Sequence, residues 1–256
     1  MSDLSPLAQF AIMMGGIFAV LGVFMEVLQA AFDWNGVTAH HTRNEFPRTV
    51  EGPELRHSVN INSAVSTGMY VVATFVFFDQ LLYSAPAPLG RVAFEIAAML
   101  LIYDGLYYML HRYAFHEWER GRRWHSVHHR IRSPRAKDSL FIHPMETFLG
   151  VATMLVSIVV TGLLSAHLLG GPGGVHTAAF GAGFFIYSAL NIYVHSGVQV
   201  PTFPLRLLST LSRNHDAHHT SMRGGYYASI TPLWDTVFGT NRETVPVGAR
   251  KRNPEH

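Results

Sequence analysis

The sequence predicts an all-α integral membrane protein with four to five transmembrane helices and a cytoplasmic helical cap. Of the 256 residues, 48% are hydrophobic and only 14% are charged, which is unusual for a soluble domain. Five apolar stretches approach the roughly 20 residues that a helix needs to cross a bilayer. Basic residues are concentrated in three of the connecting segments, as is typical of the cytoplasmic side of membrane proteins.

The five predicted spans cover approximately residues 7–32, 61–84, 92–110, 147–170 and 175–195. The residues before the first span, MSDLSP, lack the basic segment and the clear cleavage site of a secretory signal, so we expect this span to be retained. A partly re-entrant first segment would leave four full crossings instead of five. The turns SAPAPLG and GGPGG are short and rich in helix-breaking residues, which predicts tight helical hairpins.

The basic residues predict the orientation of the chain. If residues 33–60, 111–146 and 196–256 share one side of the membrane, that side holds all of the 19 Lys and Arg residues except Arg91. The positive-inside rule makes this side cytoplasmic. We expect the cytoplasmic membrane of a bacterium or the endoplasmic reticulum of a eukaryote. The loop from Asp33 to Asn60 is expected to lie along the interface.

Histidine is the most unusual feature of the composition, with 16 residues. WHSVHH (124–129) and NHDAHH (214–219) each place three histidines at i, i+3 and i+4, which share one helix face. In NIYVH (191–195), Asn191 and His195 are at i and i+4. In HRYAFH (111–116) the two histidines are at i and i+5, about 140° apart on an ideal α-helix. We expect these two to approach a cluster differently or to lie past a helix end.

All four segments fall on the predicted cytoplasmic side. One histidine pair alone is more often a solvated surface or a satisfied core feature. Two such triads at one membrane face, with two further pairs, favour a metal site instead. The candidate ligands are His111, His116, His125, His128, His129, Asn191, His195, His215, His218 and His219.

The chain has no cysteine, so any metal is held by nitrogen and oxygen. Zinc takes three or four protein ligands, fewer than this set offers, and calcium and magnesium prefer oxygen. Two iron ions with mostly imidazole ligands fit both the number and the type. Carboxylates are expected behind the rings, to orient them and moderate the charge. The candidates are Asp104, seven residues before His111, together with Asp216 and Glu146.

The three motifs HRYAFH, WHSVHH and NHDAHH resemble the histidine boxes of the fatty acid hydroxylase/sterol desaturase superfamily of membrane di-iron oxygenases. DGLYYMLHR, HPMETF, NIYVHSG and PLWDTVFGT are also similar to that family, and the resemblance covers about residues 104 to 241. It implies that the nine histidines above ligate two irons. Some relatives carry histidine where this chain has Asn191, which leaves direct binding, binding through water or a shaping role open for that residue.

The resemblance also implies the chemistry and the partners. The expected reaction is O2-dependent hydroxylation of an unactivated C–H bond, with desaturation as the other outcome, on a fatty acyl, sphingoid, sterol or isoprenoid lipid. Electrons are expected from an external carrier, either ferredoxin or cytochrome b5 with its reductase. The basic run ERGRRWHSVHHRIRSPRAK is a candidate docking surface for such an acidic carrier or for anionic lipids. No motif accompanies this charge that would indicate nucleic-acid binding.

Two other function classes compete with the oxygenase. A histidine-rich metal transporter would place its ligands near the bilayer midplane, where this sequence has none. A zinc-dependent membrane hydrolase would need fewer ligands and usually an HExxH motif, which is absent. The predicted organisation is N-terminal membrane helices and a loop at 1–90, a histidine-box catalytic domain at 91–241, and a polar tail at 242–256.

Overall fold

A computed structural model describes residues 4–33, 49–50, 52–198, 200, 202–203, 205–220 and 225–241. Most of the loop that is expected along the interface, residues 34–48 and 51, lies outside the described residues. The predicted polar tail at 242–256 also lies outside them.

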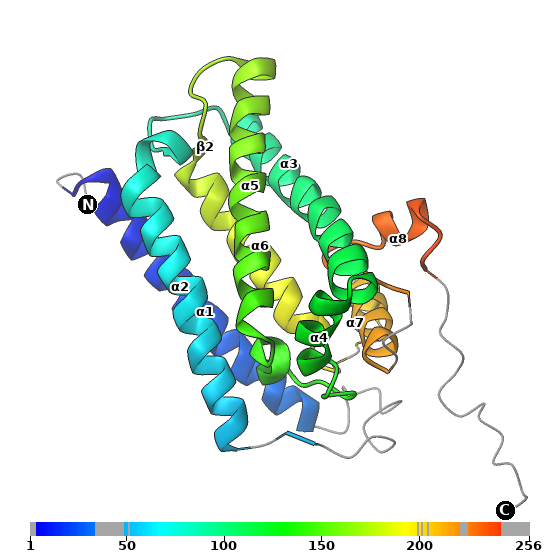
Figure 1. Cartoon of the computed structure of the whole chain (residues 1–256). Coiled ribbons are helices and arrows are strands. Elements are labelled where there is room, and N and C mark those ends of the chain that lie inside the picture. The colour runs from blue at the N-terminus through cyan, green and yellow to red at the C-terminus, as the bar shows by residue number, and fades with distance from the viewer. Residues whose placement is uncertain are drawn as a thin grey trace, which may run out of the picture.

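The described part of the chain is mostly helical (Figure 1). The long helices that could cross a membrane are α1 (Pro6–Asp33), α2 (Pro53–Leu81), α3 (Leu89–Met109), α5 (Pro144–Leu169) and α6 (Thr177–Val194). The shorter elements are the two-residue strands β1 (Leu82–Tyr83) and β2 (Val175–His176), the π-helix η1 (Leu110–Glu117), the 3-10 helix η2 (Ala136–Leu140) and the helices α4 (Glu119–His128), α7 (Leu205–His219) and α8 (Leu233–Val237).

Five helices are long and apolar enough to cross a membrane, as an all-α multi-pass membrane protein requires. Two of them differ from the predicted ranges. α2 begins at Pro53, eight residues before the predicted start at 61, because its first turns carry polar side chains that hydropathy does not recognise as part of a span. α3 continues without a break through the π-helix to Glu117, beyond the predicted end at 110.

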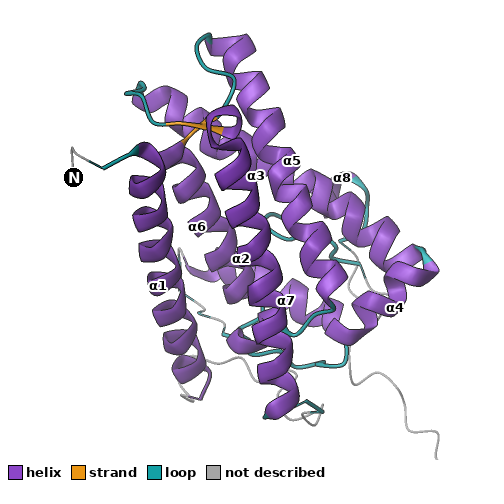
Figure 2. Cartoon of the chain, turned by 60° about the vertical axis from the view of Figure 1, so that its left-hand side comes forward, coloured by secondary structure: helices purple, strands orange, loops and turns teal. Residues whose placement is uncertain are grey.

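The helices pack around α3, which contacts α5 on one side and α6 on the other. α2 packs against α5, and α1 packs against α6 (Figure 2). The core between them is apolar and close-packed, with Met99, Tyr103 and Met154 fully buried. This arrangement brings the C-terminal ends of α3 and α6 and the N-terminal end of α5 to one end of the bundle.

Local sequence sets the ends of α5 and the start of α6. His143 precedes Pro144 and accepts a hydrogen bond from the Met145 amide at 3.1 Å, which caps α5. His176 caps α6 in the same way, through the Ala178 amide. α5 ends at Gly170, whose φ of 72° lies in the region that favours glycine. The predicted GGPGG turn therefore begins where the helix ends.

The end of the bundle far from the histidine motifs is closed by a small parallel strand pair, with Leu82 opposite Val175. Glu95 lies beneath it, fully buried. Its carboxylate accepts hydrogen bonds from Arg91 Nε at 2.8 Å, Ser165 Oγ at 2.7 Å and the His176 amide at 2.8 Å. Because an ionised group in a span needs such partners, this network explains both Glu95 and the isolated basic residue Arg91.

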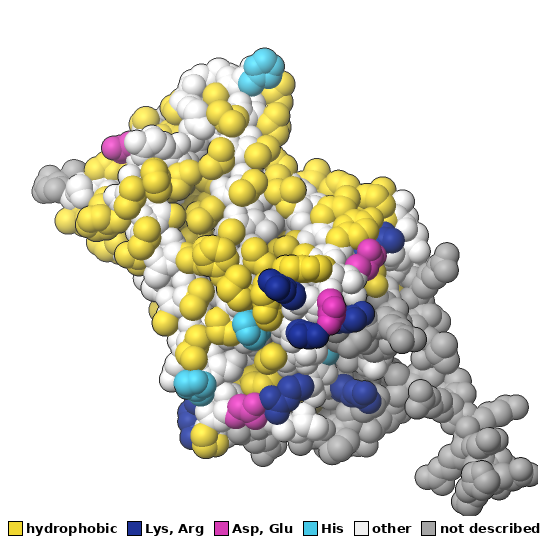
Figure 3. All heavy atoms as spheres, viewed as in Figure 1, with side chains coloured by type: hydrophobic (Ala, Val, Ile, Leu, Met, Phe, Trp, Pro, Cys, Tyr) yellow, Lys and Arg dark blue, Asp and Glu magenta, His cyan; other side chains and the backbone are white. Residues whose placement is uncertain are grey.

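α4 and α7 lie at the opposite end, beside the C-terminal ends of α3 and α6 (Figure 1). Apolar side chains cover the upper part of the molecule in Figure 3, and Lys and Arg side chains are concentrated on its lower part. The charge distribution agrees with an orientation in which the histidine-bearing end lies outside the hydrocarbon. Its assignment to the cytoplasm stays a prediction.

Candidate metal centre

A π-helix brings the first two histidines together. His111 and His116 lie in η1, a π-helix, whose hydrogen bonds join residues i and i+5. Their rings therefore approach, with centroids 5.0 Å apart, instead of pointing about 140° away from each other as on an α-helix. The spacing that looked anomalous for an α-helix is thus explained by the local backbone.

α4 returns sharply against η1 and presents His125, His128 and His129 to the same region. Gly121 allows this close approach, because a Cβ at this position would overlap the carbonyl of Ala114. α7 supplies His215, His218 and His219, and His195 follows the end of α6. The nine histidines thus converge from four parts of the chain, as the sequence predicts.

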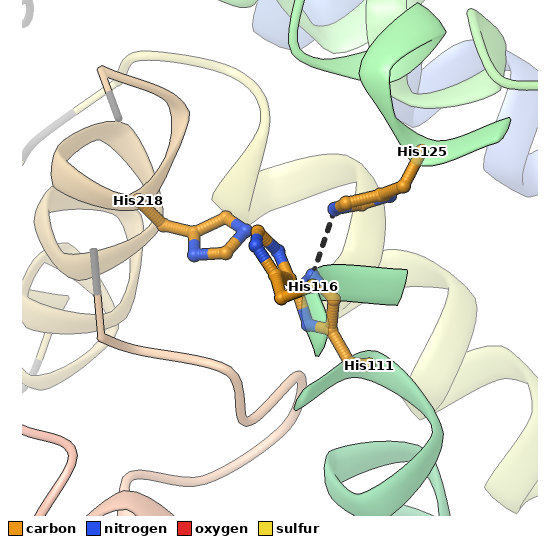
Figure 4. A group of neighbouring side chains, drawn as sticks. All are labelled: His111, His116, His125 and His218. Atoms are coloured by element: carbon orange, nitrogen blue, oxygen red, sulfur yellow. Dashed lines mark hydrogen bonds between the residues drawn. The ribbon is translucent and has the colours of Figure 1, made fainter. Parts of the chain in front are cut away.

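Eight of these histidines form two groups of four. The first group contains His111, His116, His125 and His218, and the second contains His128, His195, His215 and His219. Within each group the candidate ligand atoms lie within 4.8 Å of one another. Figure 4 shows the rings of the first group pointing toward a common centre. Helices α4 and α7 each contribute histidines to both groups, so the two candidate metal sites share the same structural elements.

His129 belongs to neither group but lies between them. Its Nε2 is 3.0 Å from His125 Nε2 and 3.1 Å from His218 Nε2, and its ring stacks on that of His219. Asn191 contributes its backbone carbonyl, which accepts a hydrogen bond from His195 Nδ1 at 2.6 Å. The Asn191 residue also lines a cavity next to His195. A role for its side chain as a ligand stays a prediction.

Most of the rings are held from behind by backbone carbonyls. The Nδ1–H groups of His111, His218, His128 and His219 donate to the carbonyls of Tyr227, Gly225, Phe141 and Ile131 at 2.7, 2.9, 3.2 and 2.9 Å. A neutral imidazole has one N–H, so a ring that donates from Nδ1 carries its lone pair on Nε2. The outer contacts therefore fix the tautomer that can bind a metal through Nε2.

The Nε2 lone pairs face one another at short range. His111 Nε2 lies 3.0 Å from His125 Nε2, and His128 Nε2 lies 3.1 Å from His195 Nε2. All four rings have their Nδ1 atom on a carbonyl or carboxylate, so neither nitrogen of these pairs has a proton to donate to the other. Two facing lone pairs repel, and a cation between them removes this repulsion. The donor set therefore fits metal ions.

The spacing also bears on coordination geometry. Ligands about 2.1 Å from an ion lie about 3.0 Å apart at right angles and about 3.4 Å apart at the tetrahedral angle. The Nε2–Nε2 separations of 2.8 to 3.1 Å in the second group are those of neighbours at right angles. Neighbouring nitrogens of this group are thus close enough to share one metal ion.

Burial keeps the rings outside the spans in the neutral form. Desolvation lowers the pKa of His125 and that of His128 to about 3, and the pKa of His195 to about 4. The pKa values of His215, His218 and His219 are also well below the usual range, because burial and the neighbouring histidines disfavour another positive charge. A metal ion can thus bind without first displacing protons.

The three predicted supporting carboxylates have different surroundings. Glu146 is buried and its Oε1 accepts a hydrogen bond from His125 Nδ1 at 3.0 Å. Asp216 is buried beside His215, and its Oδ1 has no hydrogen-bond partner among the described residues. Burial raises the pKa of Asp216 to about 7. Glu146 contacts a ring directly and can moderate the charge of a bound metal, whereas a supporting role for Asp216 stays a prediction.

Asp104 contacts a loop instead of a ring. Its carboxylate accepts hydrogen bonds from the amides of Ser229, Ile230 and Thr231 at 3.2, 2.8 and 3.2 Å, and from Thr231 Oγ1 at 2.7 Å. We therefore correct the expectation that Asp104 orients a histidine directly. The seven-residue spacing from His111 gives the right helix face, but the loop at 225–231 lies between this carboxylate and the rings that it supports.

Several groups that hold the site carry no signal in the sequence, because they are backbone carbonyls. Asp235 is an exception, because it supports the site through its side chain and lies in the motif PLWDTVFGT, so it could have been found from the sequence. It accepts hydrogen bonds from the Tyr227 and Ala228 amides at 2.9 and 3.0 Å. Gly225 is a second residue that could have been found from the sequence. Only glycine fits this position, since a Cβ there would overlap the carbonyl of Thr240. Asp104 and Asp235 together hold the loop whose carbonyls orient His111 and His218.

A cavity of about 380 Å³ leads away from the second histidine group. It is lined by His128, His195 and Glu146 at one end and by residues of α1, α2, α5 and α6 along its length. Its volume is in the range of small-molecule sites. The centre therefore has both a donor set for metals and an adjoining space for an organic ligand.

Known proteins are similar to this chain over 55% to 78% of its length. The chain is 29% identical over 157 residues to methylsterol monooxygenase 1 of Gallus gallus, covering 60% of the chain and 48% of that protein. It is 31% identical to methylsterol monooxygenase 1 of Rattus norvegicus over 55% of the chain and 44% of that protein. The chain thus spans about half the length of these two curated relatives.

A third relative is similar over more of its length. Very-long-chain aldehyde decarbonylase GL1-9 of Oryza sativa subsp. indica is 26% identical, over 78% of the chain and 76% of that protein. No solved structure matches the chain significantly. Residues 96–240, more than half of the chain, match the family described as fatty acid hydroxylase. This range contains all the histidine motifs, and the chain therefore belongs to the fatty acid hydroxylase/sterol desaturase superfamily.

Proposed function

We propose that this protein is a membrane-bound, O2-dependent oxidoreductase that uses two iron ions to hydroxylate an unactivated C–H bond of a lipid. Desaturation is the alternative outcome of the same chemistry. The observation that carries the proposal is the pair of four-histidine groups, whose Nε2 lone pairs converge beside a largely apolar cavity. The number of imidazole donors, which exceeds the three or four ligands of a zinc site, supports two irons over the zinc of a hydrolase.

The residues that would hold the metals are the two groups defined above, with His129 between them and Asn191 at the edge of the second. Iron, when bound, supplies the activation of O2 and the oxidation of the C–H bond. The chain supplies neutral rings in a fixed tautomer, a carboxylate at Glu146 that takes up part of the positive charge, and an apolar space that excludes water.

A lipid substrate agrees with the position of the cavity. The cavity runs from the histidines into the part of the bundle between the apolar helices, so a membrane lipid can reach the centre without crossing water. The relatives are named for methylsterols and very-long-chain aldehydes. We propose a sterol, isoprenoid, sphingoid or fatty acyl lipid as the substrate class.

The cytoplasmic side and an external electron donor are part of the proposal. α4 exposes Arg120, Arg122 and Arg123, while its opposite face carries His125 and His128. An acidic ferredoxin or cytochrome b5 docked on this face would lie close to the centre, and positive charge would steer it there. We propose that residues 91–241 form the catalytic domain and that the bacterial cytoplasmic membrane or the endoplasmic reticulum holds the protein.

The direct test is oxidation with isotopically labelled O2. The full chain would be loaded with ferrous iron in lipid vesicles and supplied with a reductase, an electron carrier and a panel of sterols and long-chain lipids. We expect one lipid to gain a hydroxyl group that contains the oxygen label, as mass spectrometry would detect. An unlabelled alkene would indicate the desaturation outcome. Failure to consume O2 or change any lipid after iron loading would contradict the proposal.

The loop at 225–231 gives a more selective prediction. Replacing Asp104 by alanine removes the acceptor for three amides of that loop, whose carbonyls orient His111 and His218 of the first group. Three rings of the second group are oriented by the carbonyls of Phe141, Ile131 and Asn191, which lie outside this loop. We expect iron content to fall from about two per chain toward one, because loss of such supporting contacts lowers metal affinity about 10- to 100-fold.

The stoichiometry would be measured by elemental analysis at limiting ferrous iron. Asp104→Asn is the matched variant, since an amide oxygen can still accept from part of the loop, and we expect a smaller loss. Equal loss of both irons, or no loss in either variant, would contradict the link between the loop and the first group.

A further inference from the structure

The cavity beside the second histidine group is walled by the two helices that lie outside the family match. Its walls include Phe18, Leu21 and Met25 of α1 and Ser63 and Thr67 of α2. A cavity of about 150 Å³ is enough for one benzene, so 380 Å³ corresponds to roughly fifteen carbon atoms. A whole sterol or long acyl lipid is larger than this. Part of such a ligand must therefore extend out of the cavity.

α1 and α2 run in opposite directions and meet near the end of the bundle far from the histidines. There, Phe10 and Phe78 are in edge contact, with ring centroids 5.8 Å apart. Counting along both helices from this contact places Phe18 opposite Tyr70 and Met25 opposite Ser63. All four of these residues line the cavity. The two helices thus form facing walls over the half of their length that is nearer the histidines.

The contacts of the bundle leave a seam between these walls. α1 packs against α6 and α2 packs against α5, and α1 with α2 is not among the extensively packed helix pairs of the described chain. The outward faces of both helices are apolar and exposed, with Val23 65% and Val72 60% exposed. In a membrane protein such faces meet lipid tails. The seam is therefore the weakly packed boundary between the cavity and the bilayer.

The far end of the cavity is closed by aromatic side chains. Phe184 is in edge contact with Tyr70, at 5.2 Å between centroids, and with Phe18, at 5.6 Å. From Phe184 to His195, helix α6 rises about 16 Å. A ligand whose reacting carbon lies beside His195 can extend about this far before it meets the aromatic rings. A longer ligand has to leave the cavity through the seam on the histidine side of these rings.

The two walls differ in chemistry. α1 contributes Phe18, Leu21 and Met25, which are apolar. α2 contributes Ser63, Ser66 and Thr67, which share one helix face through their i, i+3 and i+4 spacing. Ser66 Oγ donates to the Ser63 carbonyl at 3.2 Å, so its lone pairs remain able to accept a hydrogen bond. This wall can pair with a hydroxyl group, whereas a plain hydrocarbon would leave its oxygens without a partner.

We propose that the seam between α1 and α2 is a lateral entry for the substrate, and that the substrate is a hydroxyl-bearing membrane lipid whose oxygen contacts the wall formed by Ser63, Ser66 and Thr67. This inference rests on the proposed function and deepens it by naming the substrate class. It assigns substrate selection to α1 and α2, which lie outside residues 96–240. The iron chemistry and the choice of lipid would then be carried by different parts of the chain.

Gly22 offers a clean way to block the entry. It lies on α1 in the cavity wall, and a Cβ at this position would meet nothing within 4 Å. Gly22→Phe therefore fills the space between the helices without a clash at its own Cβ. Gly16, on the same helix, also has nothing within 4 Å but does not line the cavity. Gly16→Phe is the matched control.

The probes are two photoactivatable sixteen-carbon chains with a diazirine, one a primary alcohol and the other a hydrocarbon without the hydroxyl group. The full chain would be labelled in phosphatidylcholine vesicles, and the labelled residues mapped by mass spectrometry. We expect the alcohol to label the cavity walls, and Gly22→Phe to reduce this labelling about tenfold or more, since pocket contacts of this size are worth such factors. Gly16→Phe should leave it unchanged.

A second variant tests the polar wall without narrowing the entry. Thr67→Val keeps the shape of the side chain and removes its hydroxyl group, so it should reduce the preference of the cavity for the alcohol over the hydrocarbon. Labelling that Gly22→Phe does not reduce would overturn the lateral entry. Equal labelling of the wild-type cavity by both probes would overturn the substrate class. Because labelling needs neither iron nor O2, these outcomes are independent of whether the chain oxidises a lipid.

Discussion

Replacing His218 by alanine is expected to abolish lipid oxidation while the protein still inserts into the membrane. His218 is fully buried in the first group, its Nδ1 is fixed by the carbonyl of Gly225, and its Nε2 faces His129 at 3.1 Å. Removing the ring takes away one of four nitrogen donors to one metal. The loss of activity should exceed about 100-fold, because removing even a group behind a ligand costs about 10- to 100-fold.

His125→Ala should have the same effect from the other side of this group, because His125 contacts both His111 and His129. His167→Ala is the matched control, since His167 is exposed near the end of α5, far along the helix from the centre. Membrane insertion would be followed by extraction with carbonate, and oxidation by mass spectrometry of the lipid. Activity retained in both His125→Ala and His218→Ala would refute the ligand assignment.

Glu146→Ala is expected to have the second-largest effect. The Glu146 carboxylate accepts the Nδ1–H of His125 and lines the cavity beside His128 and His195. Without it, His125 loses the contact that fixes its tautomer, and the two metal charges lose a compensating negative charge. We expect iron affinity and oxidation to fall about 10- to 100-fold.

Glu146→Gln separates these two contributions. The amide oxygen can still accept from His125 Nδ1, so the orientation of the ring is kept while the negative charge is lost. We expect this variant to bind iron more tightly than Glu146→Ala and less tightly than the wild-type protein. Glu119→Ala, which alters an exposed carboxylate on α4, should change neither quantity. Equal iron affinity in Glu146→Ala and the wild-type protein would contradict the role of this carboxylate.

Hydropathy and histidine spacing predict a large part of this molecule. The five apolar helices follow directly from composition, because the bilayer imposes a length on each span. The i, i+3, i+4 spacing in WHSVHH and NHDAHH predicts correctly that each segment presents its histidines to a common region. The family resemblance based on these motifs is confirmed by the match over residues 96–240.

Other features depend on contacts that no local pattern records. The π-helix at Leu110–Glu117 changes the direction of His116, and its hydrogen-bond pattern was not predicted from the apolar period. The polar start of α2 is stabilised by tertiary hydrogen bonds. Ser58 Oγ donates to the carbonyl of Leu140 at 3.2 Å, and Asn62, one turn further on, is fully buried and donates to the carbonyl of Ile142 at 2.8 Å.

The groups that accept hydrogen bonds from the histidine rings were also difficult to predict from the sequence. Sequence reasoning looks for carboxylates, because only side chains are visible in it, and it finds Glu146 correctly as a neighbour of the rings. Most rings instead bond to carbonyls such as those of Tyr227 and Phe141. Any residue can supply a backbone carbonyl, so the residue type does not show which carbonyl holds a ring. The two walls of the cavity were missed for a related reason, since α1 and α2 carry no motif.

The most direct test of the account is the metal content of the full chain, purified from membranes in mild detergent after iron supplementation. Elemental analysis would give the stoichiometry, and Mössbauer and X-ray absorption spectroscopy would give the oxidation state and the ligands. The account predicts about two irons per chain, ligated mainly by nitrogen. Zinc alone, together with failure to bind ferrous iron on reconstitution, would contradict it.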